Sequence, residues 1–316
     1  MEKEDLTYSY KVVPLQRKGH SLHLDCMWAD GSTAGSTAGN TVGGTASNTV
    51  GGTAGRSILL THGSSCSSHI FDLDYQDYSF ARRLAREGYA VWRLDITGYG
   101  RSEEVEDGLL PDTACAAEDI AAAVETITRE TGHDRIDMLG WSWGTMTAGR
   151  FAAAHPEHLQ KLVLYGPVLF GFGSEEITEP FHHNTWETAA EDFQLTEDGR
   201  IDHTIADPVV VGIYCSNCWR YDKETSPNGW RKDVFVDHSE KLIDLESISV
   251  PTLVICGDSD PYMEMDAIMA SKDRLPEGSE LKVIPGGSHI LIYEKPHYRN
   301  FQDSVIRFLG TGRGEY

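Results

Sequence analysis

Hydrophobic residues along most of the chain form short apolar runs that alternate with amphipathic stretches. Runs such as SILLTHG at 57–63 and RIDMLGW at 135–141 are short and bounded by glycine or charged residues, which predicts buried strands. Between them, the segment that starts at Pro111 has apolar residues at helical spacing and a Pro-Asp entry, which predicts a helix. Strands that alternate with helices pair in parallel, so the pattern predicts an α/β fold.

The remaining apolar runs extend this alternation over the whole chain. Two strands precede it, at 8–15 and 21–28, and the later runs predict strands and helices in turn. The further strands are expected at 89–98, 161–167, 252–258 and 281–287, and the further helices at 78–87, 145–155 and 297–309. We therefore expect one α/β domain over residues 1–316.

Two segments interrupt the alternation. Residues 31–55 contain STAG and NTVGGTA twice each and almost no large apolar side chain, so they cannot bury enough surface to offset the entropy of ordering. We predict a flexible low-complexity loop there, at the sheet edge opposite the active site. Residues 170–244 are rich in aromatic residues with mixed periodicity, which predicts an inserted cap of helices and loops over the carboxyl edge of the sheet.

The composition narrows the classes of function. The formal net charge of −22 over 316 residues argues against electrostatic binding to nucleic acid or to an anionic membrane. The chain contains no run of 18 or more apolar residues, so we expect no membrane-spanning helix. The charged start MEKEDLTYSY lacks the apolar core of a signal peptide. We expect a cytoplasmic protein.

The cysteines also favour a cytoplasmic protein. The six cysteines are scattered, which favours reduced thiols over a disulfide framework. Cys215 and Cys218 form a lone C-x-x-C with no second pair and no recognisable histidine ligands, so the sequence favours neither a zinc site nor a redox site.

The segment LGWSWGTMTAG at 139–149 contains the pattern G-x-S-x-G around Ser142. A predicted strand precedes it and a predicted helix follows, and in that context the pattern predicts a sharp turn with a strained serine whose hydroxyl projects. Gly140 and Gly144 are needed because the strand and helix backbones pass close together. We predict that Ser142 is a nucleophile and not a residue of an ordinary turn.

A carboxylate and a histidine follow in the order Ser, Asp, His. His289 comes just after the last predicted strand, at the same sheet edge as Ser142, where it can accept the serine proton. Two carboxylates after the preceding strand compete to orient His289. Asp258 is nearer the strand, and Asp260 lies farther out, before Pro261.

The segment THGSSCSSH at 61–69 supplies a fourth component. An oxyanion hole needs backbone N–H groups directed at the developing negative charge, and losing one such donor typically costs on the order of 10²–10³ in rate. We expect one N–H from Trp143, the residue after the nucleophile, and the other from Ser64 or Ser65.

Together these motifs resemble those of the α/β-hydrolase superfamily in its capped, single-domain form. The matching pieces are His62-Gly63, DITGYGRS at 95–102, GWSWG at 140–144, GDSD at 257–260, and His289 with EKP at 294–296. Five weak motifs in family order and spacing make the resemblance specific. It implies a mostly parallel, eight-stranded sheet with helices on both faces, and the family spacing G-x-x-D favours Asp260 over Asp258. It also implies that Asp95 and Arg101 order the loop beside the site.

The resemblance implies a serine hydrolase without cofactor or metal that cleaves a carboxylic ester or lactone of a small, apolar or aromatic molecule. Alternatives that stay open are a C–C bond hydrolase, an acyltransferase, a prolyl aminopeptidase-like peptidase and a ligand receptor, and the oligomeric state is open too. We expect Trp141 to pack beneath the serine turn. The candidate substrate contacts are Trp141, His182, His183 and Trp186.

Overall fold

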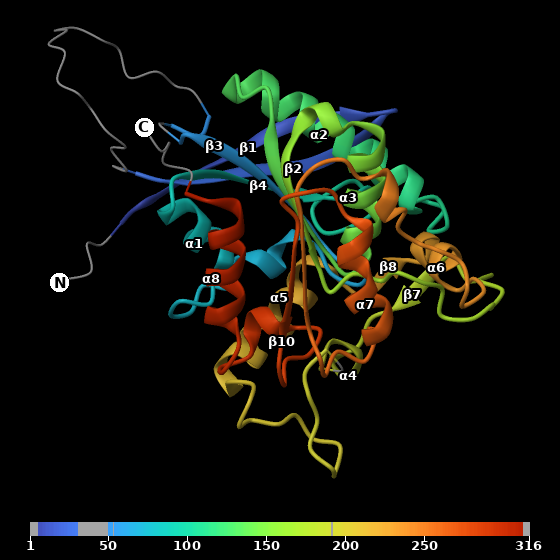
Figure 1. Cartoon of the computed structure of the whole chain (residues 1–316). Helices are drawn as coiled ribbons and strands as arrows, with labels where there is room; N and C mark the ends of the chain where they lie inside the picture. The colour runs from blue at the N-terminus through green and yellow to red at the C-terminus, as the bar shows by residue number, and fades with distance from the viewer. Residues whose placement is uncertain (1–5, 31–49, 53, 191, 312–316) are drawn as a thin grey trace, which may run out of the picture.

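A central sheet of eight strands organises the computed structural model, which describes residues 6–30, 50–52, 54–190 and 192–311 (Figure 1). The strand order is β1-β2-β4-β3-β5-β6-β9-β10, with β2 antiparallel to both of its neighbours and every other neighbouring pair parallel. The mostly parallel sheet that the sequence predicts is therefore confirmed. The bounds are β1 Tyr8–Arg17, β2 His20–Ala29, β3 Arg56–Thr61, β4 Tyr89–Asp95, β5 Ile136–Trp141, β6 Leu159–Tyr165, β9 Thr252–Gly257 and β10 Glu280–Ile284.

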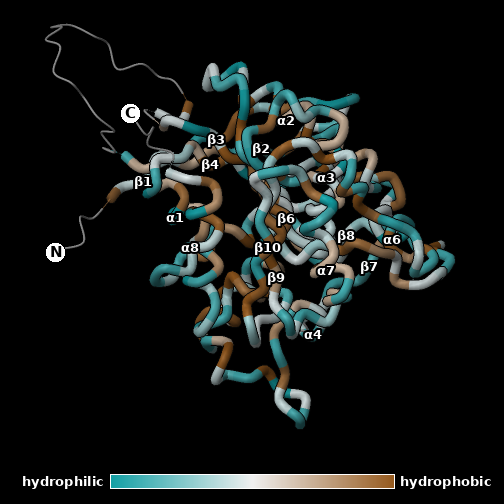
Figure 2. Tube along the Cα trace, in the orientation of Figure 1, coloured by the Kyte–Doolittle hydropathy of each residue, from teal (hydrophilic) through white to brown (hydrophobic). Residues whose placement is uncertain are grey.

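Helices cover both faces of this sheet. Successive strand residues point to opposite faces, so Leu59 packs in one apolar cluster and Leu60 in the other. Hydrophobic residues are frequent along the central strands, whereas the outer loops are more hydrophilic (Figure 2). The face of Leu60 is covered by α1 (Phe80–Arg86) and α8 (Tyr298–Leu309), and the face of Leu59 by α2 (Thr113–Thr131), α3 (Trp143–Ala154) and α7 (Met265–Ser271).

The ends of α2 show why the sequence folds as it does locally. The Asp112 side chain accepts a hydrogen bond from the backbone N–H of Cys115, which satisfies a donor of the first turn. Gly132 ends the helix at φ 75°, a conformation that glycine adopts without strain. None of the helices in the described part of the chain is long and apolar enough to cross a membrane. The expected cytoplasmic location remains a prediction.

The segment 170–244, which we call the cap segment, lies between β6 and β9 in the sequence. An isolated bridge between Phe170 and Lys241 brings its two ends together. Its short strands β7 and β8 pair with each other. The sequence predicted only helices and loops here, because a strand of three residues is too short to show an alternating pattern. Its elements are β7 (Phe181–His183), α4 (Trp186–Ala190), α5 (Pro208–Tyr221), β8 (Thr225–Pro227) and α6 (Gly229–Val234).

The predicted flexible loop at 31–55 is described only at its end, and there it is packed. Val50 is 3% exposed and belongs to an apolar cluster, while a Cβ on Gly51 would lie 2.9 Å from that of Ala90. Of the predicted loop the structure describes only residues 50–52, 54 and 55, so the flexible loop stays a prediction. Residues 31–49 and 53 lie outside the described residues. The flanks meet the start of β4, at the sheet edge opposite the carboxyl ends of the parallel strands.

Replacing residues 31–48 by a short Gly-Ser linker is expected to change kcat/KM less than about twofold, since both flanks lie at the opposite edge of the sheet. Val50→Ala in the full chain should instead lower the free energy of unfolding by about 1–3 kcal/mol, because it empties a packed position. Denaturant unfolding and steady-state kinetics on both variants check this. A large loss of activity in the linker variant would contradict the placement.

Candidate active site

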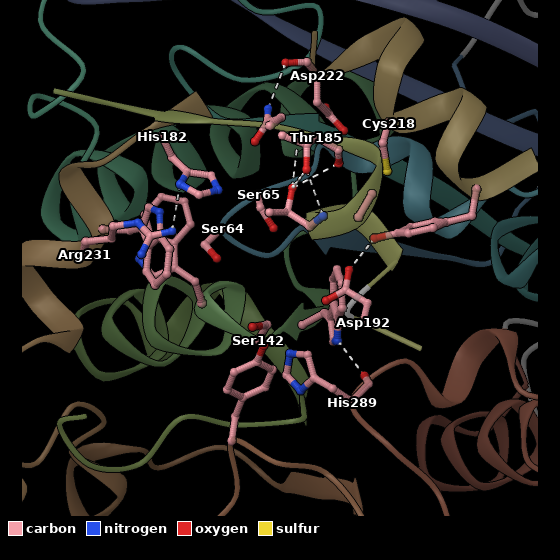
Figure 3. A pocket seen from close by; sticks show the side chains of 18 of the residues that line it. Ser64, Ser65, Ser142, His182, Thr185, Asp192, Cys218, Asp222, Arg231 and His289 are labelled. Atoms are coloured by element: carbon pink, nitrogen blue, oxygen red, sulfur yellow. Dashed lines mark hydrogen bonds between the residues drawn. The ribbon is translucent and has the colours of Figure 1, made fainter. Parts of the chain in front are cut away.

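A pocket of about 200 Å³ lies between the carboxyl ends of the parallel strands and the cap segment (Figure 3). This volume is below the 300–1,000 Å³ typical of drug-sized ligands, so the pocket suits a small molecule. The loops that follow the strands contribute one side, and the cap segment contributes the other. From the loops come Ser64, Ser65, Trp141, Ser142, Trp143, Val168, Tyr262 and His289.

Ser142 occupies the turn between β5 and α3 in a strained backbone conformation, with φ 56° and ψ −125°. Its two flanking glycines have no room for a side chain. A Cβ on Gly140 would lie 2.1 Å from the carbonyl oxygen of Gly144, and one on Gly144 would lie 2.6 Å from that of His62. The close passage of strand and helix that the sequence predicts is present, and it directs Ser142 into the pocket.

His289 lies beside Ser142 in the pocket (Figure 3). Its ring is bonded to Asp260. The Nδ1 atom of His289 is 2.7 Å from Oδ2 of Asp260, and both side chains are buried. Burial by itself lowers the pKa of His289, but the charge and hydrogen bond of Asp260 outweigh it and raise that pKa above 6.5. Asp258 is exposed and accepts a hydrogen bond from the N–H of Gly286 at 2.6 Å. Of the two competing carboxylates, Asp260 contacts His289.

The backbone of His289 is held by side chains from two strands. The indole N–H of Trp141 and the hydroxyl of Tyr165 both donate to the His289 carbonyl oxygen, at 3.1 and 2.8 Å. The ring of Tyr262 packs edge-on to the imidazole, with 4.8 Å between centroids. Trp141 thus packs behind the serine turn, as expected, and also lines the pocket.

Sequence reasoning missed several of these supports. Tyr165 and Tyr262 sit in segments that read as strand and loop, with no chemical signal of their own. Glu294 was noted only as part of a family motif, but it is fully buried and accepts a hydrogen bond from the Ser288 hydroxyl at 2.6 Å. That carboxylate fixes the loop on which His289 sits. An acidic residue five positions after the candidate base was the available signal.

The candidate oxyanion loop is anchored through His62. Its Nδ1 lies 2.7 Å from the carbonyl oxygen of Gly63, and its Nε2 accepts the N–H of Ile96 at 3.1 Å. Burial lowers the pKa of His62, which fits a neutral ring that donates at one nitrogen and accepts at the other. Ser64 is half-buried and Ser65 is exposed, and both line the pocket.

Trp143 and Asp95 hold the surroundings of this loop. Trp143 is the first residue of α3, so no helical carbonyl precedes its backbone N–H. Its indole N–H donates to the Thr113 hydroxyl at 2.9 Å. Asp95 is buried and accepts from the N–H groups of Ser68 and Arg101, at 2.9 and 3.0 Å. The expected ordering role of Asp95 and Arg101 matches these contacts.

The cap segment brings two of its three predicted contacts into the pocket. His182 and Trp186 line it, and Trp186 stacks on Trp219 with 6.3 Å between ring centroids. His183 does not line it. Consecutive side chains of a strand point to opposite sides, so when His182 of β7 faces the pocket, the exposed His183 faces solvent.

The structure also gives Cys218 neighbours that the sequence did not reveal. Ligand atoms of His69, Cys218 and Asp222 lie within 4.8 Å of one another, so these three residues could hold a metal ion. His69 and Asp222 are already joined at 2.7 Å, an ion pair between the core and the cap segment if His69 is protonated. Burial raises the pKa of the Cys218 thiol, which keeps it protonated without a metal.

Comparison with known proteins agrees with this geometry. The family model described as serine aminopeptidase, S33 matches residues 54–296. The chain belongs to this family of α/β-hydrolases. The S33-family chain is 25% identical over 267 residues to carboxylesterase YbfK of Bacillus subtilis, which covers 81% of each chain. It is 26% identical over 229 residues to a putative non-heme chloroperoxidase of Synechocystis sp., over 66% of this chain and 77% of that protein.

Solved structures share the fold of this S33-family chain. A bromoperoxidase from Bacillus anthracis matches with a TM-score of 0.63 and 18% identity, over 95% of this chain and 99% of that one. An esterase from Exiguobacterium antarcticum has the same TM-score and coverage at 16% identity. Family, relatives and fold together make this chain a hydrolase of the α/β-hydrolase superfamily, as the sequence motifs indicated.

Gly140→Ala should lower the free energy of unfolding by at least about 2 kcal/mol or prevent folding, because the new Cβ collides with backbone that cannot move without displacing α3. Gly212→Ala is the matched control. Gly212 lies within α5 with no atom within 4 Å of its ideal Cβ, so alanine there should stabilise by about 0.5–1 kcal/mol. Urea unfolding of both variants measures the contrast, and a Gly140→Ala variant of unchanged stability would contradict the tight crossing.

Proposed function

We propose that this chain is a serine hydrolase that cleaves a carboxylic ester or lactone of a small molecule through an acyl-enzyme on Ser142. The observation that carries the proposal is the combination of Ser142 at positive φ in the pocket with His289 beside it, bonded to Asp260. This is the arrangement of nucleophile, base and orienting acid that nucleophilic catalysis requires. The carboxylesterase among the relatives supports the ester as substrate class.

In the proposed reaction, His289 takes the proton of Ser142 as its oxygen attacks the substrate carbonyl. The carbonyl oxygen becomes an oxyanion, which accepts hydrogen bonds from the backbone N–H of Trp143 and of Ser64 or Ser65. His289 then gives its proton to the departing alcohol, which leaves an acyl group on Ser142. A water molecule, deprotonated by His289, hydrolyses that acyl group and restores the serine. None of these proposed reaction steps uses a metal or a cofactor.

Asp260 has a positioning role in this proposal. Its bond to Nδ1 of His289 leaves Nε2 of the ring to face the serine, and its charge stabilises the imidazolium that forms. The cap segment, with Trp186, His182 and Trp219, limits access to the acyl and alcohol portions of the substrate.

Hydrolysis of a carbon–carbon bond is a second candidate. A 2-hydroxy-6-oxononadienedioate/2-hydroxy-6-oxononatrienedioate hydrolase of Cupriavidus pinatubonensis is 25% identical to this chain over 248 residues, which covers 72% of this chain and 78% of that protein. The same serine, histidine and aspartate would serve such a reaction. Disappearance of the absorbance of a 2-hydroxy-6-oxodienoate, with no turnover of esters, would favour this candidate.

Ser142→Ala is expected to abolish labelling by a fluorophosphonate and to reduce hydrolysis of 4-nitrophenyl esters and lactones by at least about 10³-fold, because the nucleophile is removed. Ser247→Ala, at an exposed serine of the loop before β9, serves as the control and should retain both. Gel fluorescence and steady-state kinetics read the result. Full labelling of the Ser142→Ala protein would exclude this serine as the nucleophile.

The rate should also depend on pH in a way that reports on Asp260. His289 must be neutral to accept a proton, so kcat/KM should rise with pH through a midpoint above 6.5, because Asp260 raises the pKa of His289. Asp260→Asn should move that midpoint to lower pH and reduce kcat by orders of magnitude, whereas Asp258→Asn should alter neither appreciably. A pH–rate profile for each variant provides the check. The reverse outcome would assign the orienting role to Asp258.

A further inference from the structure

Arg231 places a cation in the pocket wall that the proposed reaction does not use. It lies on α6 in the cap segment, lines the pocket and is partly buried. Figure 3 shows it beside His182 on one side of the pocket, with Asp192 on the other side and Ser142 with His289 below.

The other charged groups around the pocket have partners of their own. Asp222 pairs with His69, Lys223 with Glu104, and His289 with Asp260. Asp192 accepts the hydroxyl of Tyr214 at 2.6 Å. Each of these groups therefore has a hydrogen-bond or ion-pair partner within the protein, although the Tyr214 hydroxyl is neutral and does not balance a charge on Asp192.

Arg231 differs from them. Within the described part of the chain, no carboxylate lies within ion-pair distance of its guanidinium, although the protein has 49 acidic residues against 27 basic ones. Burial has the largest effect on the pKa of Arg231 and lowers it. Tyr99 and then Glu175, the first carboxylate among the causes, raise that pKa from a distance. Its Nε atom is buried and has no hydrogen-bond partner. An unpaired buried donor costs free energy unless a ligand satisfies it.

Two contacts fix Arg231 in place without neutralising it. Its Nη2 donates to Nδ1 of His182 at 3.2 Å, and its guanidinium carbon lies 4.7 Å from the ring centroid of Trp230. Burial, with the nearby Arg231 charge, lowers the pKa of His182, so that ring accepts this bond as a neutral group. Burial also lowers the pKa of Arg231 itself, yet a guanidinium stays charged at neutral pH. Arg231 is therefore a partly desolvated cation in a fixed position, and its Nε–H group has no hydrogen-bond partner.

We infer that Arg231 binds a carboxylate of the substrate, so that this hydrolase acts on a small ester or lactone that carries a free carboxylate, such as the half-ester of a dicarboxylic acid. The inference rests on the proposed hydrolysis at Ser142 and names its substrate class. A planar guanidinium forms two parallel hydrogen bonds with a carboxylate, which gives orientation as well as affinity. One cation beside a neutral His182, with Asp192 across the pocket, matches a single negative charge better than a phosphate dianion.

The test compares ester pairs of equal length that differ only in the terminal group. On the acyl side, 4-nitrophenyl hydrogen glutarate is paired with the valerate and the hydrogen adipate with the hexanoate. On the alcohol side, 3-acetoxybenzoate is paired with 3-acetoxytoluene. With uncatalysed rates subtracted, the enzyme should prefer the charged member of at least one series. Arg231→Met should lower kcat/KM for that member about 10–100-fold and change the neutral member less than about threefold.

Two further variants separate recognition from a general effect of the cap. Arg231→Lys keeps the charge but loses the planar fork, so it should retain only part of the preference. Lys232→Met removes a charge from the same helix at an exposed residue and should leave the preference unchanged. An enzyme with no preference for the charged esters would overturn the inference. So would equal losses on both members in Arg231→Met, or stronger inhibition by alkyl phosphonates than by alkyl carboxylates.

Failure of this inference can be told apart from failure of the proposed function. Turnover of neutral esters that depends on Ser142, without Arg231-dependent selectivity, would keep the function and overturn the carboxylate site. If no ester is turned over, glutarate binding is measured by tryptophan fluorescence in the wild-type and Arg231→Met proteins, since Trp230 contacts Arg231. Binding that disappears only in Arg231→Met would keep the carboxylate site, and binding that is equal in both would overturn it.

Discussion

The close crossing of β5 and α3 is the constraint on which the site depends. The backbones pass so tightly that Gly140 and Gly144 have no space for a Cβ, and the residue between them must turn at positive φ. The strain of that turn is carried by packing on both sides. Trp141 is buried against Tyr165 and Trp143 against Tyr99, so the two tryptophans fasten the turn to opposite parts of the core. Ser142 is exposed to the pocket because everything around it is fixed.

The same packing connects the serine to the histidine. Trp141 precedes Ser142 in the chain and donates to the carbonyl of His289, 148 residues away in sequence. Tyr165, at the end of the next strand, donates to the same oxygen. The turn that positions the proposed nucleophile thus also positions the proposed base. Hydrogen bonds from rigid aromatic side chains suit this purpose, because they hold a loop with little loss of side-chain entropy on folding.

Electrostatics divides the pocket into compensated and uncompensated parts. The charge of Asp260 is buried against His289, and that of Asp222 against His69, so each serves a partner inside the protein. Arg231 has no such partner among the described residues, although the chain as a whole is strongly acidic. The cap segment supplies this cation, whereas the loops after the strands supply the proposed reacting groups. In the proposed function, chemistry and selectivity therefore come from different parts of the chain.

The sequence by itself determined the α/β architecture and pointed to Ser142, His289 and the candidate oxyanion loop as the proposed site. These follow from local features: apolar runs of strand length, glycines at a turn, and functional residues just after strands, which parallel pairing brings to one edge. The resemblance to the α/β-hydrolase superfamily favoured Asp260 over Asp258, but only the fold places Asp260 against the imidazole and Asp258 against Gly286. The tertiary structure alone decided that His182 lines the pocket while His183 does not, that Val50 is packed, and that Arg231 faces the pocket. Those outcomes depend on which segments meet in space, and the irregular cap segment has no periodic pattern from which such meetings can be read.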